Sequence, residues 1–336
     1  MEQLRFYLPK YTPIYKSGSK LCIGYPNKSN SYCEFDYTEK LSNMVVELLE
    51  EGKFQDNFGS FEMELLGNKL LSNDIPTDFT HRGELFLKYI DNIVIDKETK
   101  NCSILIFGAG AVGSNLLYLL AQFGFNNITI VDFDIVSESD VLKISIYDKK
   151  DIGRFKIEAL HEKISANFGI DIRYFNKRDD SESFFKEMIL EIKPEFIIKA
   201  CDPNLIFRTN LNSVAVKNNI PCFHAAYSFE KLRIGPLYIP NYLGCDECLD
   251  LINQDYYGRH YAFREHEQLF YSLKIHPSVS FNINILCSLA LKEILFFLTG
   301  NVKYCFSIGR LIEFNPLDLT YVAFEVEKHP LCTICK

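Results

Sequence analysis

The chain has 336 residues, of which 47% are hydrophobic and 24% charged, and its net charge is −8. This composition is ordinary for a globular protein, and the length suits two domains or one large one. The acidic balance argues against a protein that coats nucleic acid, Lys292 and Glu293 interrupt the longest apolar run, and the N-terminus lacks the apolar core of a signal peptide. We therefore expect a cytoplasmic protein without nucleic-acid or membrane partners.

Residues 1–85 differ in pattern from the rest of the chain. Apolar residues recur at helical spacing within residues 37–53, and Gly52 ends that pattern. A shorter helix and a strand-like segment at 66–72 follow. The other strand-like segments are 4–8, 13–17, 21–25 and 33–37, with turns at Gly18 and at 27–30. This order predicts a small winged-helix-like (α+β) module, which either caps the main domain or binds a peptide. A connector at 75–92 becomes helical near Glu84.

The segment 101–135 predicts a nucleotide site. It consists of a short apolar strand, the glycines Gly108, Gly110 and Gly113 in the pattern G-x-G-x-x-G, and a helix over 112–123 that Gly124 ends. Such glycines allow a tight turn, a close approach of backbone to phosphate and close packing of helix on sheet. The amides at the helix N-terminus then face the anion.

The second strand of this segment ends in Asp132 and Asp134. A carboxylate at this point of a nucleotide-binding fold can bind the ribose hydroxyls. The pattern indicates a nucleotide, without saying which one.

Strands and helices continue to alternate from 154 to 228. Helices are expected at 154–169, 181–193 and 208–219, and strands at 170–176, 194–202 and 220–228. Beyond 229 the pattern is more β-like, with one more long helix at 280–298. We therefore predict that residues 86–336 form an α/β domain with a doubly wound, mainly parallel, Rossmann-like sheet.

Four of the 11 cysteines form two C-x-x-C pairs, Cys245 with Cys248 and Cys332 with Cys335. Each pair supplies two thiolates from a tight turn, and four thiolates complete a tetrahedral shell around Zn²⁺. A complete shell indicates a structural site, which would fasten the C-terminal tail to the loop at 240–250. Two unrelated redox or turn motifs are the alternative.

Two further residues bear on the chemistry. Lys156, with Arg154 beside it, begins the helix after the glycine segment and can place a cation near the phosphates; a solvated helix residue is the alternative. Asp202 ends a predicted strand, where such sheets bind ligands, and its carboxylate can hold Mg²⁺ beside a triphosphate. A helix N-cap is the alternative for Asp202.

Taken in order, these motifs resemble the ThiF/MoeB family of ubiquitin-activating-enzyme-like adenylyltransferases over roughly residues 84–336. The matching segments are GAGAVGSN, VDFD, YDKKDIGRFKIEAL, ACD and the two C-x-x-C pairs. Within the family, the resemblance is strongest to the MccB-like peptide-modifying enzymes of microcin C type pathways. It is carried by HRGELFLKYIDN, IPCFHAAY, IGPLYIPNYLGCDEC and HPLCTIC.

The resemblance implies an enzyme that binds Mg·ATP and activates a carboxylate of a short ribosomal precursor peptide as its acyl-adenylate. Residues 1–85 would be the leader-peptide clamp, and a homodimer is expected. Gly108, Gly110 and Gly113 would cradle the phosphates and Asp132 or Asp134 would hold the ribose. Lys156 would contact the phosphates, Asp202 would bind Mg²⁺, and the cysteines would hold structural Zn²⁺.

The chain departs from the family at one motif. The family carries N-x-x-R-Q shortly after the second strand, and here the matching residues are Asp140 to Ile144. Lys143 replaces the phosphate-binding arginine, which keeps the charge but loses the bidentate fork. Three other functions therefore stay open: a non-catalytic ThiF-like partner that presents a leader peptide to a cyclodehydratase, a sulfur-carrier-protein adenylyltransferase, and an NAD dehydrogenase.

Overall fold

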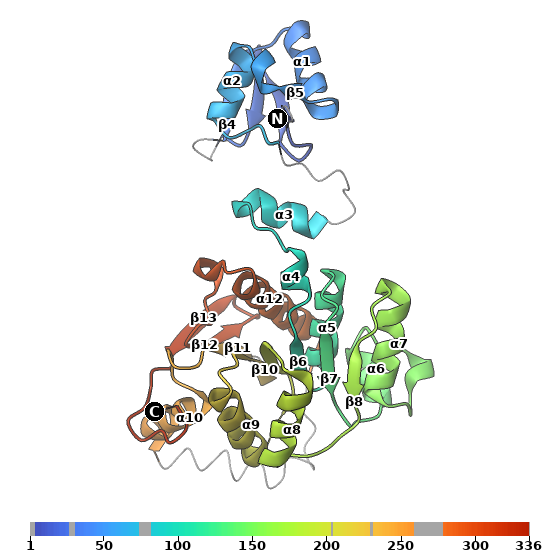
Figure 1. Cartoon of the computed structure of the whole chain (residues 1–336), viewed down its shortest axis with the longest axis vertical. Coiled ribbons are helices and arrows are strands. Elements are labelled where there is room, and N and C mark those ends of the chain that lie inside the picture. Colours follow the sequence, from blue (N-terminus) through green and yellow to red (C-terminus); the bar gives the residue numbers. More distant parts are fainter. Residues whose placement is uncertain are drawn as a thin grey trace. The chain divides into compact units, whose positions relative to one another are not determined.

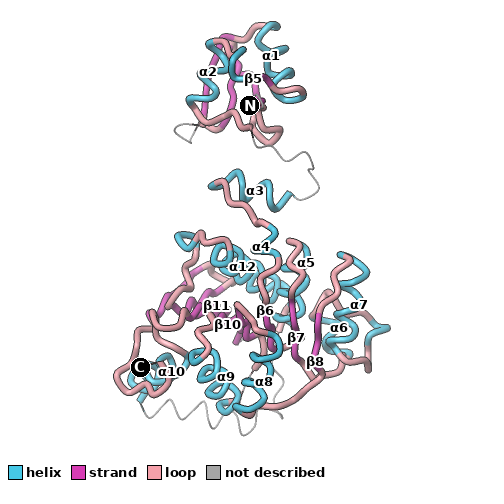
Figure 2. The backbone as a smooth tube through the Cα atoms, in the orientation of Figure 1, coloured by secondary structure: helices cyan, strands magenta, loops and turns pink. Residues whose placement is uncertain are grey.

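A computed structural model of the chain describes residues 4–26, 31–73, 82–202, 204–228, 231–258 and 278–335. The chain divides into two units, Met1–Leu85 and Phe86–Lys336, and Figures 1 and 2 show the elements of each. The turn predicted at 27–30 and the connector at 75–81 lie outside the described residues.

The first unit packs two helices on a three-stranded antiparallel sheet of order β2-β3-β4. Thr38 caps the longer helix, because its side chain accepts a hydrogen bond from the amide of Leu41. The core joins Leu21 and Ile23 of the sheet to Leu48 and Leu65 of the helices. The elements are β1 (Arg5–Phe6), β2 (Ile14–Ser17), β3 (Lys20–Gly24), β4 (Tyr32–Asp36), α1 (Glu39–Glu50), β5 (Lys53–Phe54), η1 (Gln55–Asn57) and α2 (Ser60–Gly67).

The strand predicted at 66–72 is wrong. Residues 66 and 67 end α2, and Ser72 alone pairs, in an isolated bridge with Tyr7. Lys69 has a φ of +53°, which turns the chain out of the helix and prevents an extended run. The apolar residues that suggested a strand, Leu70 and Leu71, are buried in the core of the first unit.

The second unit is built on an eight-stranded sheet of order β13-β12-β11-β10-β9-β6-β7-β8. Its elements are α3 (Arg82–Asp91), α4 (Lys97–Lys100), β6 (Ile104–Phe107), α5 (Ala111–Gln122), β7 (Ile128–Val131), α6 (Glu138–Lys143), η2 (Lys149–Asp151), α7 (Lys156–Phe168), β8 (Arg173–Phe175), α8 (Glu182–Ile192), β9 (Phe196–Lys199), α9 (Leu205–Lys217), β10 (Cys222–Ser228), β11 (Lys231–Tyr238), α10 (Asp246–Tyr257), α12 (Ser280–Leu298), η5 (Val302–Tyr304), β12 (Arg310–Asn315) and β13 (Thr320–Glu325). Helix α3 begins at the end of the first unit and continues into the second.

The predicted doubly wound, mainly parallel sheet is confirmed. Strands β10, β9, β6, β7 and β8 run parallel, whereas β11, β12 and β13 add to one side as antiparallel strands. The strand order reverses between β6 and β9, so the chain leaves β6 toward β7 on one side and returns to β9 on the other. Ligands bind such sheets outside the carboxyl ends of the strands at this reversal.

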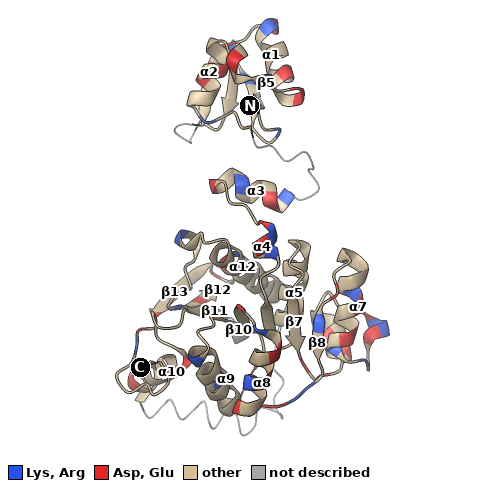
Figure 3. Ribbon diagram, viewed as in Figure 1, with Lys and Arg blue, Asp and Glu red and all other residues tan. Residues whose placement is uncertain are grey.

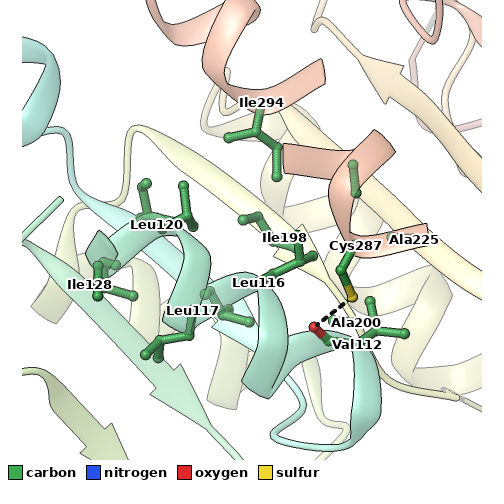
Figure 4. Packing of buried hydrophobic residues seen from close by; sticks show 14 of the residues in the cluster. Val112, Leu116, Leu117, Leu120, Ile128, Ile198, Ala200, Ala225, Cys287 and Ile294 are labelled. Atoms are coloured by element: carbon green, nitrogen blue, oxygen red, sulfur yellow. Dashed lines mark hydrogen bonds between the residues drawn. The ribbon is translucent and has the colours of Figure 1, made fainter. Parts of the chain in front are cut away.

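Helices cover both faces of the sheet. The buried strand β6 alternates between them, since Ile104 and Ile106 face α5, α7 and α12, whereas Leu105 and Phe107 face α8 and α9. Figure 4 shows the first of these layers, in which Val112, Leu116 and Leu120 of α5 pack beside Cys287 and Ile294 of α12. The two helix layers therefore hold the ends of β6, β7 and β9 in fixed register.

Helix α12 is, within the described residues, long and apolar enough by composition to cross a membrane. Half of its apolar window is buried inside the second unit, where Ile283, Leu286 and Ala290 belong to the main core. The helix contacts α5, β10 and β11. A core helix meets the same compositional test, and the packing of α12 is that of a core helix.

Candidate nucleotide site and cysteine cluster

The glycine turn closes tightly between β6 and α5. Gly108 has a φ of +103°, and a Cβ built on Gly113 would lie 1.8 Å from the carbonyl oxygen of Gly108. Side chains at these two positions would break the turn. A Cβ on Gly110 meets nothing within 4 Å, so the fold itself does not require a glycine there. Gly110 is also the N-cap of α5 and has no side chain to cap it, which leaves space for a ligand against the helix amides.

Asp132, directly after β7, binds the glycine turn. Its Oδ2 accepts a hydrogen bond of 2.6 Å from the amide of Ala109, and its Oδ1 accepts one of 2.7 Å from the amide of Asp134. Burial raises the pKa of Asp132 above its usual range, against the lowering effect of these two bonds. The structure thus brings Asp132 to the edge of the turn, as a ribose-binding role requires.

Lys156 is buried rather than solvated. It begins α7, and its amide donates to the carbonyl of Asp134 at 2.9 Å, so the helix start is fixed to the loop after β7. Its Nζ lies 3.3 Å from Oδ2 of Asp134 and 3.7 Å from Oδ2 of Asp140. The Nζ of Lys143 lies 3.4 Å from the other oxygen of Asp140. Charges of both signs lie side by side around α6 and α7 (Figure 3).

We call Asp134, Asp140, Lys143 and Lys156 the charge quartet. Two carboxylates and two ammonium groups balance within it, so neither lysine carries an uncompensated charge. Lys143 and Lys156 were predicted site residues, and the quartet brings them together on the single carboxylate of Asp140.

Sequence reasoning missed Tyr147, which links the two parts of the site. Its hydroxyl donates a 2.8 Å hydrogen bond to the carbonyl of Ala109 in the glycine turn and lies 3.5 Å from the carbonyl of Lys156. Tyr147 is buried, and burial raises the pKa of its hydroxyl. An aromatic residue two turns before a buried lysine gives no pattern of its own, so only the fold reveals the link.

Asp202 lies just past the carboxyl end of β9. The strand end abuts the glycine turn, because Ala200 donates its amide to Phe107 and a Cβ on Gly108 would lie 2.7 Å from the carbonyl of Ala200. Asp202 is not the N-cap of α9. Asn204 takes that position, and its side chain accepts a 2.7 Å hydrogen bond from the amide of Phe207. The side chain of Asp202 is exposed at this edge.

The four cysteines of the C-x-x-C pairs gather in one buried cluster beside α10. The ligand atoms of Cys245, Cys248, Cys332 and Cys335 all lie within 4.8 Å of one another. Sulfur–sulfur distances of 3.4–3.7 Å exclude disulfides, whose sulfurs are about 2.05 Å apart. They fit the roughly 3.8 Å edge of a tetrahedron whose metal–sulfur bonds are about 2.3 Å.

Polar groups around the cluster complete it. The amide of His329 points at the sulfur of Cys248 at 3.3 Å, and the side-chain amide of Asn212, on α9, donates to Cys245 at 3.3 Å. Glu247 accepts from the amides of Thr333 and Ile334 and so joins the last turn of the chain to α10. Such bonds to sulfur favour thiolates, which is the form that binds a metal. Asn212 and Glu247 lie outside any cysteine motif, and the sequence alone did not reveal them.

An open α/β sheet with a glycine turn, a ribose-side carboxylate and a buried lysine at its strand reversal defines a nucleotide-binding protein. The ThiF family model matches residues 92–334, and the chain belongs to the ThiF family.

Relatives in this family are enzymes of adenylyltransferase or E1-activating type. A probable adenylyltransferase/sulfurtransferase MoeZ of Mycobacterium tuberculosis is 40% identical over 70 residues, which is 21% of this chain and 18% of that protein. The Nedd8-activating enzyme E1 catalytic subunit of Drosophila melanogaster is 31% identical over 94 residues, 27% of this chain and 21% of its own. The chain thus matches only about a fifth of the length of these relatives.

Solved structures resemble the whole chain. E. coli MccB with AMPCPP and MccA has a TM-score of 0.72 at 18% identity, covering 99% of this chain and 100% of that one. E. coli MccB with ATP has a TM-score of 0.70 at 18% identity, covering 98% and 99%. At this identity the likeness establishes a shared fold across both units.

Proposed function

We propose that the protein uses Mg·ATP to adenylate a carboxylate of a short, ribosomally made precursor peptide, in the cytoplasm. An internal nucleophile of the peptide would then attack the activated carbonyl and form a ring or a new bond to nitrogen. The meeting of the glycine turn, Asp132 and Asp202 at the strand reversal carries this proposal. The likeness to E. coli MccB, solved with MccA and with ATP, supports it.

Each residue of the site has a role that its position supports. Gly110 and the amides of α5 would receive the phosphates, and Asp132 would bind the ribose, with Asp134 as the alternative. Lys156 and Lys143 would offset the charge of the phosphates, while the helix terminus and lysines bring two anions together without a nucleophilic side chain.

Asp202 would hold Mg²⁺. Magnesium in nucleotide sites commonly takes one or two carboxylates and completes its shell with phosphate oxygens and water. An exposed carboxylate beside the glycine turn fits that donor set. When bound, the ion would neutralise charge on the leaving pyrophosphate.

Zn²⁺ in the cysteine cluster would have a structural role. Four protein thiolates complete its shell and leave no position for substrate. The metal would hold the last residues of the chain against α10.

The first unit would bind the peptide. Its sheet has two open edges, β2 and β4, and an extended peptide can add to such an edge as a further strand. Removing residues 1–73, which leaves α3 intact, should abolish peptide binding measured by fluorescence anisotropy and retain Mg·ATP binding. Unchanged peptide affinity would reject this role.

We also propose a homodimer. Strand β13 ends the large sheet and exposes Tyr321, Val322 and Phe324. An exposed apolar edge strand is usually covered by another chain. Analytical ultracentrifugation should give twice the chain mass, and a monomer at micromolar concentration would contradict it.

A non-catalytic leader-binding partner is the second candidate, favoured by the charge balance of the quartet, since a site that offers no net positive charge binds triphosphate weakly. Pyrophosphate release separates the two functions. The assay uses Mg·ATP and a synthetic copy of the short peptide encoded beside the gene. Peptide-dependent release supports adenylation, whereas tight peptide binding without ATP turnover supports the second candidate. An encoded Gly-Gly carrier beside the gene would instead favour sulfur-carrier activation.

A further inference from the structure

Asp140 is the fixed member of the charge quartet. Only 5% of the residue is exposed, and its Oδ2 accepts hydrogen bonds from the amide of Ser137 at 3.0 Å and its hydroxyl at 2.7 Å. This capping box starts α6 and holds the carboxylate in one orientation. Although burial opposes ionisation, these bonds and the two lysines hold the pKa of Asp140 below its usual range, so it is charged at neutral pH.

Asp134, the other carboxylate of the quartet, is held much less firmly. Its side chain is 52% exposed and lies in the loop after β7. An arriving phosphate can displace Asp134 from Lys156, because water can solvate the released carboxylate. The same phosphate cannot displace Asp140, whose cap keeps it beside both lysines.

We propose that Asp140 is a positioning residue that holds Lys143 and Lys156 in place for the phosphates and weakens phosphate affinity, so that pyrophosphate leaves readily. This inference rests on the proposed function. A buried negative charge next to two cations lowers the attraction of the pair for another anion. It also restricts the two flexible ammonium groups to one geometry, which favours a defined transition state over tight binding of ground state or product.

The test is Asp140→Asn in the full chain. Asparagine keeps the shape and an oxygen acceptor for Ser137 but removes the charge. We expect Mg·ATP and inorganic pyrophosphate to bind about tenfold more tightly by calorimetry, and kcat to fall by about tenfold, so that KM and kcat decrease together. A purely structural cap would not produce tighter binding.

Asp151→Asn is the matched control. Asp151 is also a buried aspartate at the third position of a capping box, and it lies 2.8 Å from Lys163 on the same helix as Lys156. This variant should leave pyrophosphate affinity and kcat unchanged. Unchanged or weaker pyrophosphate binding in Asp140→Asn would overturn the inference.

Two further outcomes are decisive. If Asp140→Asn unfolds, Asp140→Ser supplies a second neutral acceptor, and loss of folding in both variants but not in Asp151→Asn would reduce Asp140 to a structural cap. Pyrophosphate separates the inference from the proposed function. If pyrophosphate affinity changes as expected but Mg·ATP does not bind the unmodified protein, the nucleotide assignment fails and the role of Asp140 stands.

Discussion

The cysteine cluster and the charge quartet are both buried polar sites, yet they differ in how complete they are. The cluster collects four identical ligands that have no other purpose, and neighbouring amides point at the sulfurs. The quartet pairs its charges with one another, and one of its carboxylates is half exposed. A site that needs only a metal is finished by the chain itself, whereas a site that must bind and release substrate keeps groups that can change partners.

Loss of the metal should have the largest effect. Cys332→Ser should lower bound zinc from one ion per chain to none and reduce Tm by more than about 10 °C, because folding is coupled to metal binding. Elemental analysis and calorimetry measure the two. Cys287→Ser, a buried cysteine outside the cluster, is the control and should keep its zinc. Full zinc content in Cys332→Ser would show that the cluster is not a metal site.

Asp202→Ala should come next, with an effect on turnover alone. Loss of the magnesium ligand should slow pyrophosphate release by about 10²–10³-fold, while Tm changes by less than about 2 °C because Asn204 caps α9. A large fall in Tm would instead assign Asp202 a structural role. Stopped assays at saturating Mg²⁺ and thermal melts distinguish these results.

Lys156→Met should have a smaller effect, since Lys143 remains. We expect Mg·ATP affinity to fall by about tenfold and turnover by about 10–100-fold. Lys163→Met removes a similarly placed lysine of α7, which binds Asp148 and Asp151, and should leave both values unchanged. Equal effects of the two variants would mean that Lys156 only stabilises α7.

The smallest effect is a pH difference between two carboxylates of the nucleotide edge. Burial raises the pKa of Asp132, so its ionised form costs stability, and that cost appears as pH rises through the raised value. Asp140 behaves in the opposite way. Its pKa is lowered, so its stabilisation is present above about 3.8 and is lost as pH falls through the folded value. Carboxyl-carbon NMR should give a higher midpoint for Asp132 than for Asp140, and the reverse order would contradict their environments.

The sequence was sufficient for the sheet and for the cysteine cluster, for physical reasons. Continuous apolar strands such as β6 and β9 are long-range features that survive in the sequence pattern, and C-x-x-C spacing fixes two ligands locally. Strand-like residues 66–72 misled, because the buried leucines there serve a turn whose conformation depends on Lys69.

The nucleotide edge was only partly predictable. Gly108 and Gly113 follow from the motif, but the contact of Asp132 with Ala109, the link through Tyr147 and the burial of Lys156 depend on tertiary packing. The partnership of Asp140 with both lysines depends on a short helix, α6, whose capping box brings a carboxylate inward. Residues that act through distant neighbours leave no spacing to recognise.

Titration of the purified full-length protein with Mg·ATP, and in parallel with NADH, tests the central claim most directly. The account predicts that Mg·ATP binds at one site per chain, that Asp132→Asn weakens this binding, and that NADH produces no heat of binding. Binding of NADH, with no association of Mg·ATP even when the peptide encoded beside the gene is present, would contradict it.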